Sequence, residues 1–115
     1  MMHAAEPTPI EQLKKAVIDQ KTATLPPEEE DPALVNLHEV MVAYEQLVSQ
    51  IVIGLIQTDH ADIPWDQIHA DQNEISRLLS SPQAQASRKT DFYRAYAARL
   101  DRMITLAGQA AGHNA

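Results

Sequence analysis

The sequence contains no cysteine, so a disulfide, a thiolate metal site and a cysteine nucleophile are all excluded. Glycine is scarce too, with three residues among 115, and no glycine-rich phosphate-binding loop is present. Aromatic residues make up only 4% of the chain, so Leu, Ile, Val, Ala and Met must fill most of the core. Because alternating β-branched runs are also few, this composition favours helices over strands.

The sequence also lacks the features of membrane insertion and of a cleaved signal. It has no run of about eighteen consecutive apolar residues, the length needed to cross a bilayer. The start, "MMHAAEPTP", has neither the basic residues nor the apolar segment of a signal peptide. We therefore expect no membrane span and a cytoplasmic location in a bacterium, although a protein exported without a cleaved signal would share these features.

Positive charge is in deficit, and the imbalance is uneven along the chain. The formal net charge is −7 at pH 7, with residues 1–76 summing to −11 and residues 77–115 to +4. Opposite fields of this kind suit helices that fold back on one another or subunits that stack end to end. The acidic part repels phosphate, which disfavours nucleic acid as a partner.

The length predicts one helical domain over residues 1–115, with disordered ends at 1–8 and 111–115. Residues 23–31, "ATLPPEEED", are predicted to be an acidic, proline-rich linker between two helices. The run of carboxylates at its end has two interpretations. It stabilises a helix N-terminus, or it is an acidic docking strip for a basic partner.

Three segments carry a capping residue followed directly by proline, the pattern of a helix start: "TPIE" at Thr8, "DPAL" at Asp31 and "SPQA" at Ser81. A fourth start is expected near Asp62, where Pro64 falls in a first turn. The predicted helices are residues 9–22, 32–58, 64–80 and 83–110. The predicted fold is therefore all-α, a small helical bundle of three to four helices with a long antiparallel helix pair.

The second helix carries an apolar stripe at spacings of three and four residues, which widens at Ile53 and Ile56. One neighbouring helix cannot cover so broad a face. We therefore predict a non-enzymatic bacterial interaction protein, an adaptor, chaperone-like protein or assembly subunit, that binds a protein partner or itself as a homodimer or larger assembly. The predicted partner-binding residues are Leu37, Met41, Tyr44, Val48, Ile51, Val52 and Leu55.

A basic last helix supports an alternative function, a nucleic-acid-associated regulator. Basic side chains alternate there with aromatic ones, an arrangement that can hold phosphates and stack bases. Against this interpretation, the tyrosines fall on the apolar side of the helix. The residues that would bind nucleic acid are Arg88, Lys89, Arg94, Arg99 and Arg102.

The segment "DHADIPWDQIHADQNE" holds the densest group of possible metal ligands. Asp66 and His69 lie three residues apart on a predicted helix, but no second histidine follows at the fourth position, so the spacing matches no metal motif. His38 lies beside the apolar stripe and is expected to be a solvated surface residue rather than a general base. We therefore predict no catalytic residue, no metal and no cofactor.

The words "LHEVMVAYEQ", residues 37–46, are similar to the segment that opens the C-terminal helix of the flagellar hook-basal body rod adaptor family and to inner-rod subunits of type III secretion systems. The resemblance covers ten residues, and about seventy residues follow Glu45 here, whereas in those families the segment lies close to the chain's end. It implies a second alternative, a secretion or flagellar rod-associated subunit, and transfers no functional residue.

Overall fold

The structure is a computed structural model that describes residues 8–20, 25–26, 28–58, 60 and 62–113. All regular secondary structure in these ranges is helical, which confirms the predicted all-α class. Four of the five helices are long and one has only four residues. They are α1 (Pro9–Gln20), α2 (Val35–Thr58), α3 (Trp65–Leu79), α4 (Pro82–Gln85) and α5 (Thr90–His113).

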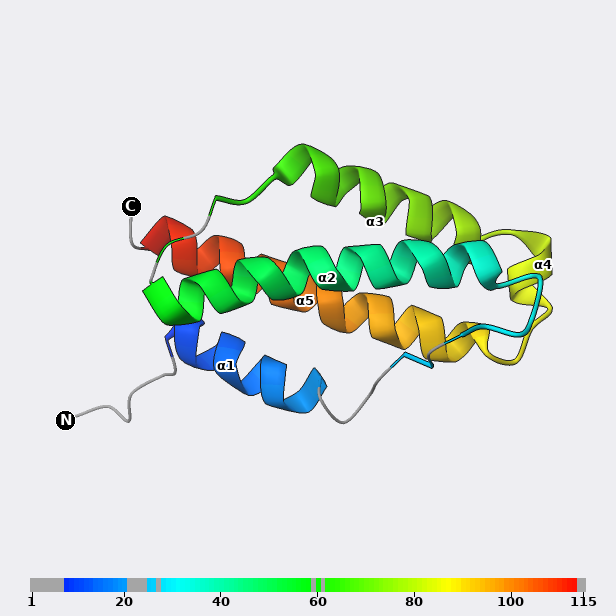
Figure 1. The fold of residues 1–115 in the computed structure, drawn as a ribbon, viewed down its shortest axis with the longest axis horizontal. Coiled ribbons are helices and arrows are strands. Elements are labelled where there is room, and N and C mark those ends of the chain that lie inside the picture. Colours follow the sequence, from blue (N-terminus) through cyan, green and yellow to red (C-terminus); the bar gives the residue numbers. More distant parts are fainter. Residues whose placement is uncertain (1–7, 21–24, 27, 59, 61, 114–115) are drawn as a thin grey trace.

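The long helices lie side by side, and α5 packs against α1, α2 and α3 (Figure 1). Helices α2 and α5 run in the same direction, whereas α1 and α3 run the opposite way (Figure 1). Two hydrogen bonds between α2 and α5 show the same direction. His38, near the start of α2, contacts Tyr93, near the start of α5, and Tyr44, further along α2, contacts Asp101, further along α5. The expected antiparallel direction is therefore wrong for the two longest helices, since α3 carries the chain back along the molecule before α5 begins.

Capping hydrogen bonds confirm two of the predicted helix starts. At α1 the backbone N–H of Glu11 donates to Thr8 Oγ1, and that of Thr8 donates to Glu11 Oε2, each at 3.3 Å. This reciprocal pair is a capping box. At α4 the backbone N–H of Ala84 donates to Ser81 Oγ at 3.1 Å, with proline at the first helical position.

Other predicted boundaries differ from the structure. Helix α2 begins at Val35 rather than at 32, because the N–H of Ala33 donates to Asp31 Oδ1 at 3.0 Å within a preceding turn. Residues 111–113, predicted to be disordered, are the last residues of α5. The predicted disordered ends at 1–7 and 114–115, and linker residues 23–24 and 27, lie outside the described residues.

The single helix predicted over 83–110 is interrupted at residues 86–89. Two hydrogen bonds replace a continuous helix there. Ser87 Oγ donates to Asp31 Oδ2 at 3.1 Å, and Thr90 Oγ1 donates to the carbonyl of Ala84. The break brings the chain before α2 against the start of α5.

The apolar stripe of α2 forms the centre of the core. None of its seven predicted partner-binding residues is more than 5% exposed, and all belong to one buried cluster with side chains of α5. Those residues therefore form no exposed face in this structure, because the chain's own helices cover them. Of the residues that widen the stripe, Ile56 packs against the core and Ile53 is 51% exposed.

By length and composition alone, α2 is also apolar enough to cross a membrane. The central helix of a water-soluble bundle has the same composition, because it is covered by helices on several sides. Helix α2 packs against α1, α3 and α5 and buries eight of its residues within the chain.

Gly108 lies beneath the ring of Trp65, the only tryptophan of the chain. A Cβ atom here would lie 3.0 Å from Trp65 Cη2, and the ring is 43% exposed, so it can move outward. We expect Gly108→Ala to stabilise the fold by up to about 1 kcal/mol through helix propensity. Gly108→Val, with a larger branched side chain, should destabilise by about 1 to 2 kcal/mol and displace the ring.

Thermal unfolding and tryptophan fluorescence together test this contact. Ring displacement in Gly108→Val should shift the emission toward that of a solvent-exposed indole. If both variants unfold at the temperature of the natural protein with unchanged emission, the packing of Trp65 on Gly108 is refuted.

Candidate functional site

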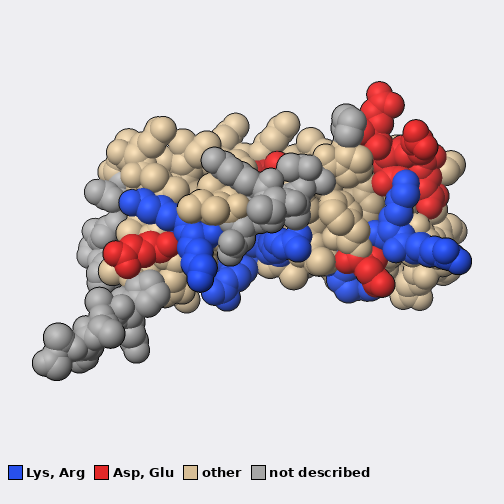
Figure 2. Space-filling view, turned by 90° about the horizontal axis from the view of Figure 1, so that it is seen from below, with Lys and Arg blue, Asp and Glu red and all other residues tan. Residues whose placement is uncertain are grey.

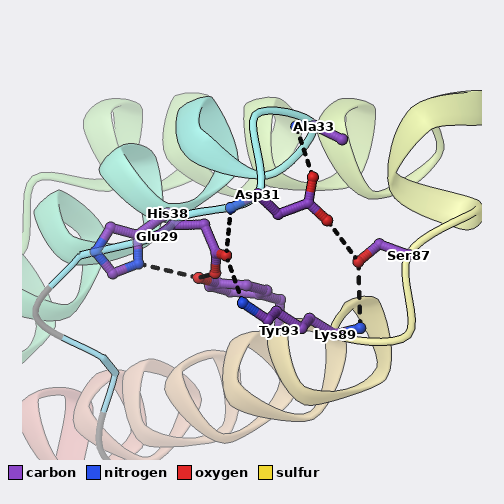
Figure 3. A network of polar contacts seen from close by, with 7 residues as sticks. All are labelled: Glu29, Asp31, Ala33, His38, Ser87, Lys89 and Tyr93. Carbon is purple, nitrogen blue, oxygen red and sulfur yellow. Dashed lines mark hydrogen bonds and ion pairs between the residues drawn. The ribbon is translucent and has the colours of Figure 1, made fainter.

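A buried carboxylate joins the acidic linker to α5. The Glu29 side chain is only 1% exposed, although an ionised carboxylate is costly to bury. It accepts hydrogen bonds from Lys89 Nζ at 2.9 Å, from the Tyr93 hydroxyl at 2.5 Å and from the backbone N–H of Asp31 at 3.1 Å (Figure 3). Three donors, one of them cationic, replace the water that the carboxylate loses on burial.

His38 extends these contacts to α2. The residue is 8% exposed and its Nδ1 lies 3.0 Å from the Tyr93 hydroxyl oxygen, so the expectation of a solvated surface histidine is wrong. Because the hydroxyl proton of Tyr93 points to Glu29, the contact requires the tautomer in which His38 Nδ1 donates. The two rings meet edge to face with centroids 6.1 Å apart.

A second set of hydrogen bonds holds Asp31 in place. Asp31 accepts from Ser87 Oγ at 3.1 Å, and Ser87 Oγ accepts in turn from the backbone N–H of Lys89 at 3.3 Å (Figure 3). Together these contacts tie the linker to α2 and to the start of α5. We call the set the junction network: Glu29, Asp31, His38, Ser87, Lys89 and Tyr93.

Burial and hydrogen bonding shift the pKa values of Glu29 and Tyr93 in the junction network. Burial raises the pKa of Glu29, but the hydrogen bonds from Tyr93, Lys89 and Asp31 and the Lys89 charge outweigh it and lower the pKa to about 2. Burial raises the pKa of Tyr93, and the hydrogen bond to Glu29 and its charge raise it further. At neutral pH the network thus holds a charged Glu29 carboxylate that accepts a hydrogen bond from a protonated Tyr93 phenol.

An open groove of about 570 Å³ lies over this network, between the linker and the first turn of α5. Phe92 is 38% exposed there, and its ring lies against Tyr93 and Tyr96, with centroids 5.5 and 5.8 Å apart. The rim carries the exposed carboxylates of Glu28 and Glu30, neither of which forms an ion pair with a described residue. We call this the linker groove, lined by Pro26, Glu28, Glu29, Glu30, Lys89, Phe92 and Tyr93.

A second polar cluster joins three helices elsewhere in the bundle. The Tyr44 hydroxyl donates to Asp101 Oδ1 at 2.7 Å, and Gln72 Nε2 donates to both at 3.0 and 3.2 Å. Burial raises the pKa of Tyr44, and Asp101 raises it further, so the phenol stays protonated. These groups satisfy one another and hold α2, α3 and α5 together.

The five residues predicted for nucleic-acid binding are all exposed, but they do not share one face. Lys89 pairs with Glu29, and Arg94 pairs with Asp91 at 3.1 Å. Arg94 and Arg99 lie five residues apart, which is about 140° around the helix. Figure 2 shows Lys and Arg in separate groups on the face it draws, and the largest group of carboxylates lies at one end of the molecule beside Lys or Arg side chains.

The possible metal ligands of the sequence do not converge. Among the described residues, no group of three or more His, Asp or Glu side chains could hold an ion. His69 instead stacks on Trp65, with centroids 5.9 Å apart, and its Nδ1 lies 3.4 Å from Gln72 Oε1. Asp66 occupies the first turn of α3, as its position suggested. The absence of a bound metal or cofactor stays a prediction.

Sequence reasoning identified the acidic strip but not the groove beside it. The only available signal was charge: the acidic segment "PPEEED" and the basic segment "SRKTDFY" have opposite net charges and lie about sixty residues apart in the chain. Comparisons of the chain with protein-family models, with curated proteins and with solved structures found no match.

Proposed function

We propose that the protein is a non-enzymatic interaction protein, an adaptor or assembly subunit of the bacterial cytoplasm, that binds a protein partner through the linker groove. One observation carries the proposal. Phe92, a large aromatic residue, is 38% exposed in the groove, where the neighbouring Lys89 and Tyr93 are already hydrogen-bonded to Glu29. Aromatic side chains in such positions are the usual anchors of protein interfaces.

The hydrogen bonds beneath the groove support the same proposal. The junction network ties the linker at Glu29 and Asp31 to α2 and α5, so this part of the groove is formed before a partner arrives. A preformed site loses less conformational entropy on binding. The proposed architecture is a small bundle in which the apolar stripe of α2 supplies stability and the linker groove supplies recognition.

Site-specific photo-crosslinking tests this function in the intact chain. A benzophenone amino acid at Phe92 should crosslink a discrete protein in cells of the natural source. The same amino acid at Ile53, which is 51% exposed on α2, is the matched control and should crosslink much less. A crosslink at Ile53 with none at Phe92 would refute the linker groove as the binding site.

A further inference from the structure

We infer that the linker groove binds a short, lysine- or arginine-rich segment of a protein partner, with one large apolar side chain of that segment seated on Phe92. This inference rests on the proposed function and adds the chemistry of the partner. It follows from the charge of the rim, the apolar floor and the size of the groove.

Negative charge on the rim is in excess and available. Of the four consecutive acidic residues at 28–31, Glu29 and Asp31 are bound within the junction network, whereas Glu28 and Glu30 are exposed and have no ion pair with a described residue. Lys89 is bonded to Glu29 and its charge also acts on Glu30 and Asp31, so the four acidic residues exceed the one lysine that interacts with them. A cationic segment complements the two remaining carboxylates, and such complementarity favours fast and specific association.

The floor and the volume define the rest of the segment. Pro26 and Phe92 contribute apolar surface, and about 570 Å³ is the volume of a small-ligand site. That space accommodates one or two large side chains rather than the whole face of a helix. The fitting segment therefore has a single apolar anchor with positive residues on both sides.

The charge of the rim disfavours other classes of occupant. Glu28 and Glu30 repel the phosphates of nucleic acids and of anionic lipids. The charge does not disfavour a second copy of this chain, which has exposed basic residues such as Lys14 and Lys15 on α1. The experiment must therefore distinguish self-association from binding of a different protein.

Calorimetric titration of the full chain with short synthetic peptides tests the inference. The probe has a central phenylalanine flanked by lysines, and two matched controls replace the lysines by glutamates or the phenylalanine by serine. We expect only the probe to bind, and its affinity should fall as salt screens the rim. Equal binding of the serine control would overturn the apolar anchor, and binding of the glutamate control would overturn the charge assignment.

Variants of the groove locate the binding. Phe92→Ala should lower the affinity for the probe by about tenfold, the loss typical of an aromatic anchor. The double variant Glu28→Gln with Glu30→Gln should weaken it by about fivefold at low salt and by less at high salt. The controls Ile53→Ala and Asp62→Asn, an exposed apolar and an exposed acidic residue elsewhere, should leave the affinity unchanged.

The outcomes separate the inference from the function on which it rests. A Phe92 crosslink to another protein, without probe binding to the groove, would keep the function and overturn the basic segment. A Phe92 crosslink between two copies of the chain would overturn a separate partner. Probe binding that the groove variants leave unchanged would overturn the inference whatever the crosslinks show.

Discussion

Val48→Asp is expected to unfold the chain. Val48 is fully buried at the centre of the α2 stripe, and the core cluster formed by the described residues contains no Lys or Arg. An aspartate there loses the apolar contacts of valine and must bury a carboxylate without a partner, a cost above about 5 kcal/mol. This cost matches the entire stability of many small domains. Circular dichroism should show loss of helix at neutral pH.

The matched control for this prediction is Ile53→Asp, the same change five residues later on the same helix. Because Ile53 is 51% exposed, the aspartate can reach water, and the helix signal should persist with a small loss of stability. A Val48→Asp protein that stays helical but loses self-association would contradict the account. The stripe would then be a surface between copies rather than the core of one chain.

Replacement of Glu29 by alanine is expected to give the second-largest loss of stability. The change leaves the Tyr93 hydroxyl and the N–H of Asp31 without their acceptor in a partly buried place, and it removes the partner of Lys89. The free energy of unfolding should fall by about 2 to 3 kcal/mol, measured by urea denaturation. Glu30→Ala is the control, because this neighbouring carboxylate is exposed and its loss should cost little.

The same carboxylate should make the fold sensitive to acid. In the folded chain the pKa of Glu29 is lowered from 4.5 to about 2, so folding favours the charged form. Its contribution to stability is therefore fully present above the unfolded value of 4.5 and is lost as the pH falls toward 2. Glu29→Gln, which cannot titrate, should be less stable at neutral pH and should lose less stability across this range. An identical acid dependence in both proteins would contradict the proposed role of Glu29.

Local signals in the sequence were sufficient for part of the fold. The capping box at Thr8 and the cap at Ser81 depend on residues three positions apart, so the pattern alone locates them. The length of the helix after Ser81 does not follow from its cap. The break before α5 depends on the bond between Ser87 and Asp31, which are 56 residues apart in the chain.

The apolar stripe shows a different limit of sequence patterns. Spacings of three and four residues identify the side of α2 that is covered, and the structure buries all seven residues chosen from it. The pattern is the same whether the covering helix belongs to the same chain or to another. Only the positions of α3 and α5 show that one chain is enough to cover it.

The candidate site depends on the burial of one acidic side chain, that of Glu29. Four consecutive acidic residues before a helix usually remain in water. Here Glu29 is buried, because Tyr93, Lys89 and the N–H of Asp31 all reach it. No local pattern in "EEED" distinguishes Glu29 from Glu28 and Glu30, so its burial and the groove over it emerge only from the tertiary structure.

Amide hydrogen exchange of the isolated chain, measured over about a hundredfold range of protein concentration, tests the central claim most directly. The claim is that one chain covers the α2 stripe by itself, which leaves recognition to the linker groove. We predict that the amides of residues 37–55 exchange only through global unfolding and that their protection is independent of concentration. Protection that rises with concentration would contradict the claim, because a second copy would then be needed to cover the stripe.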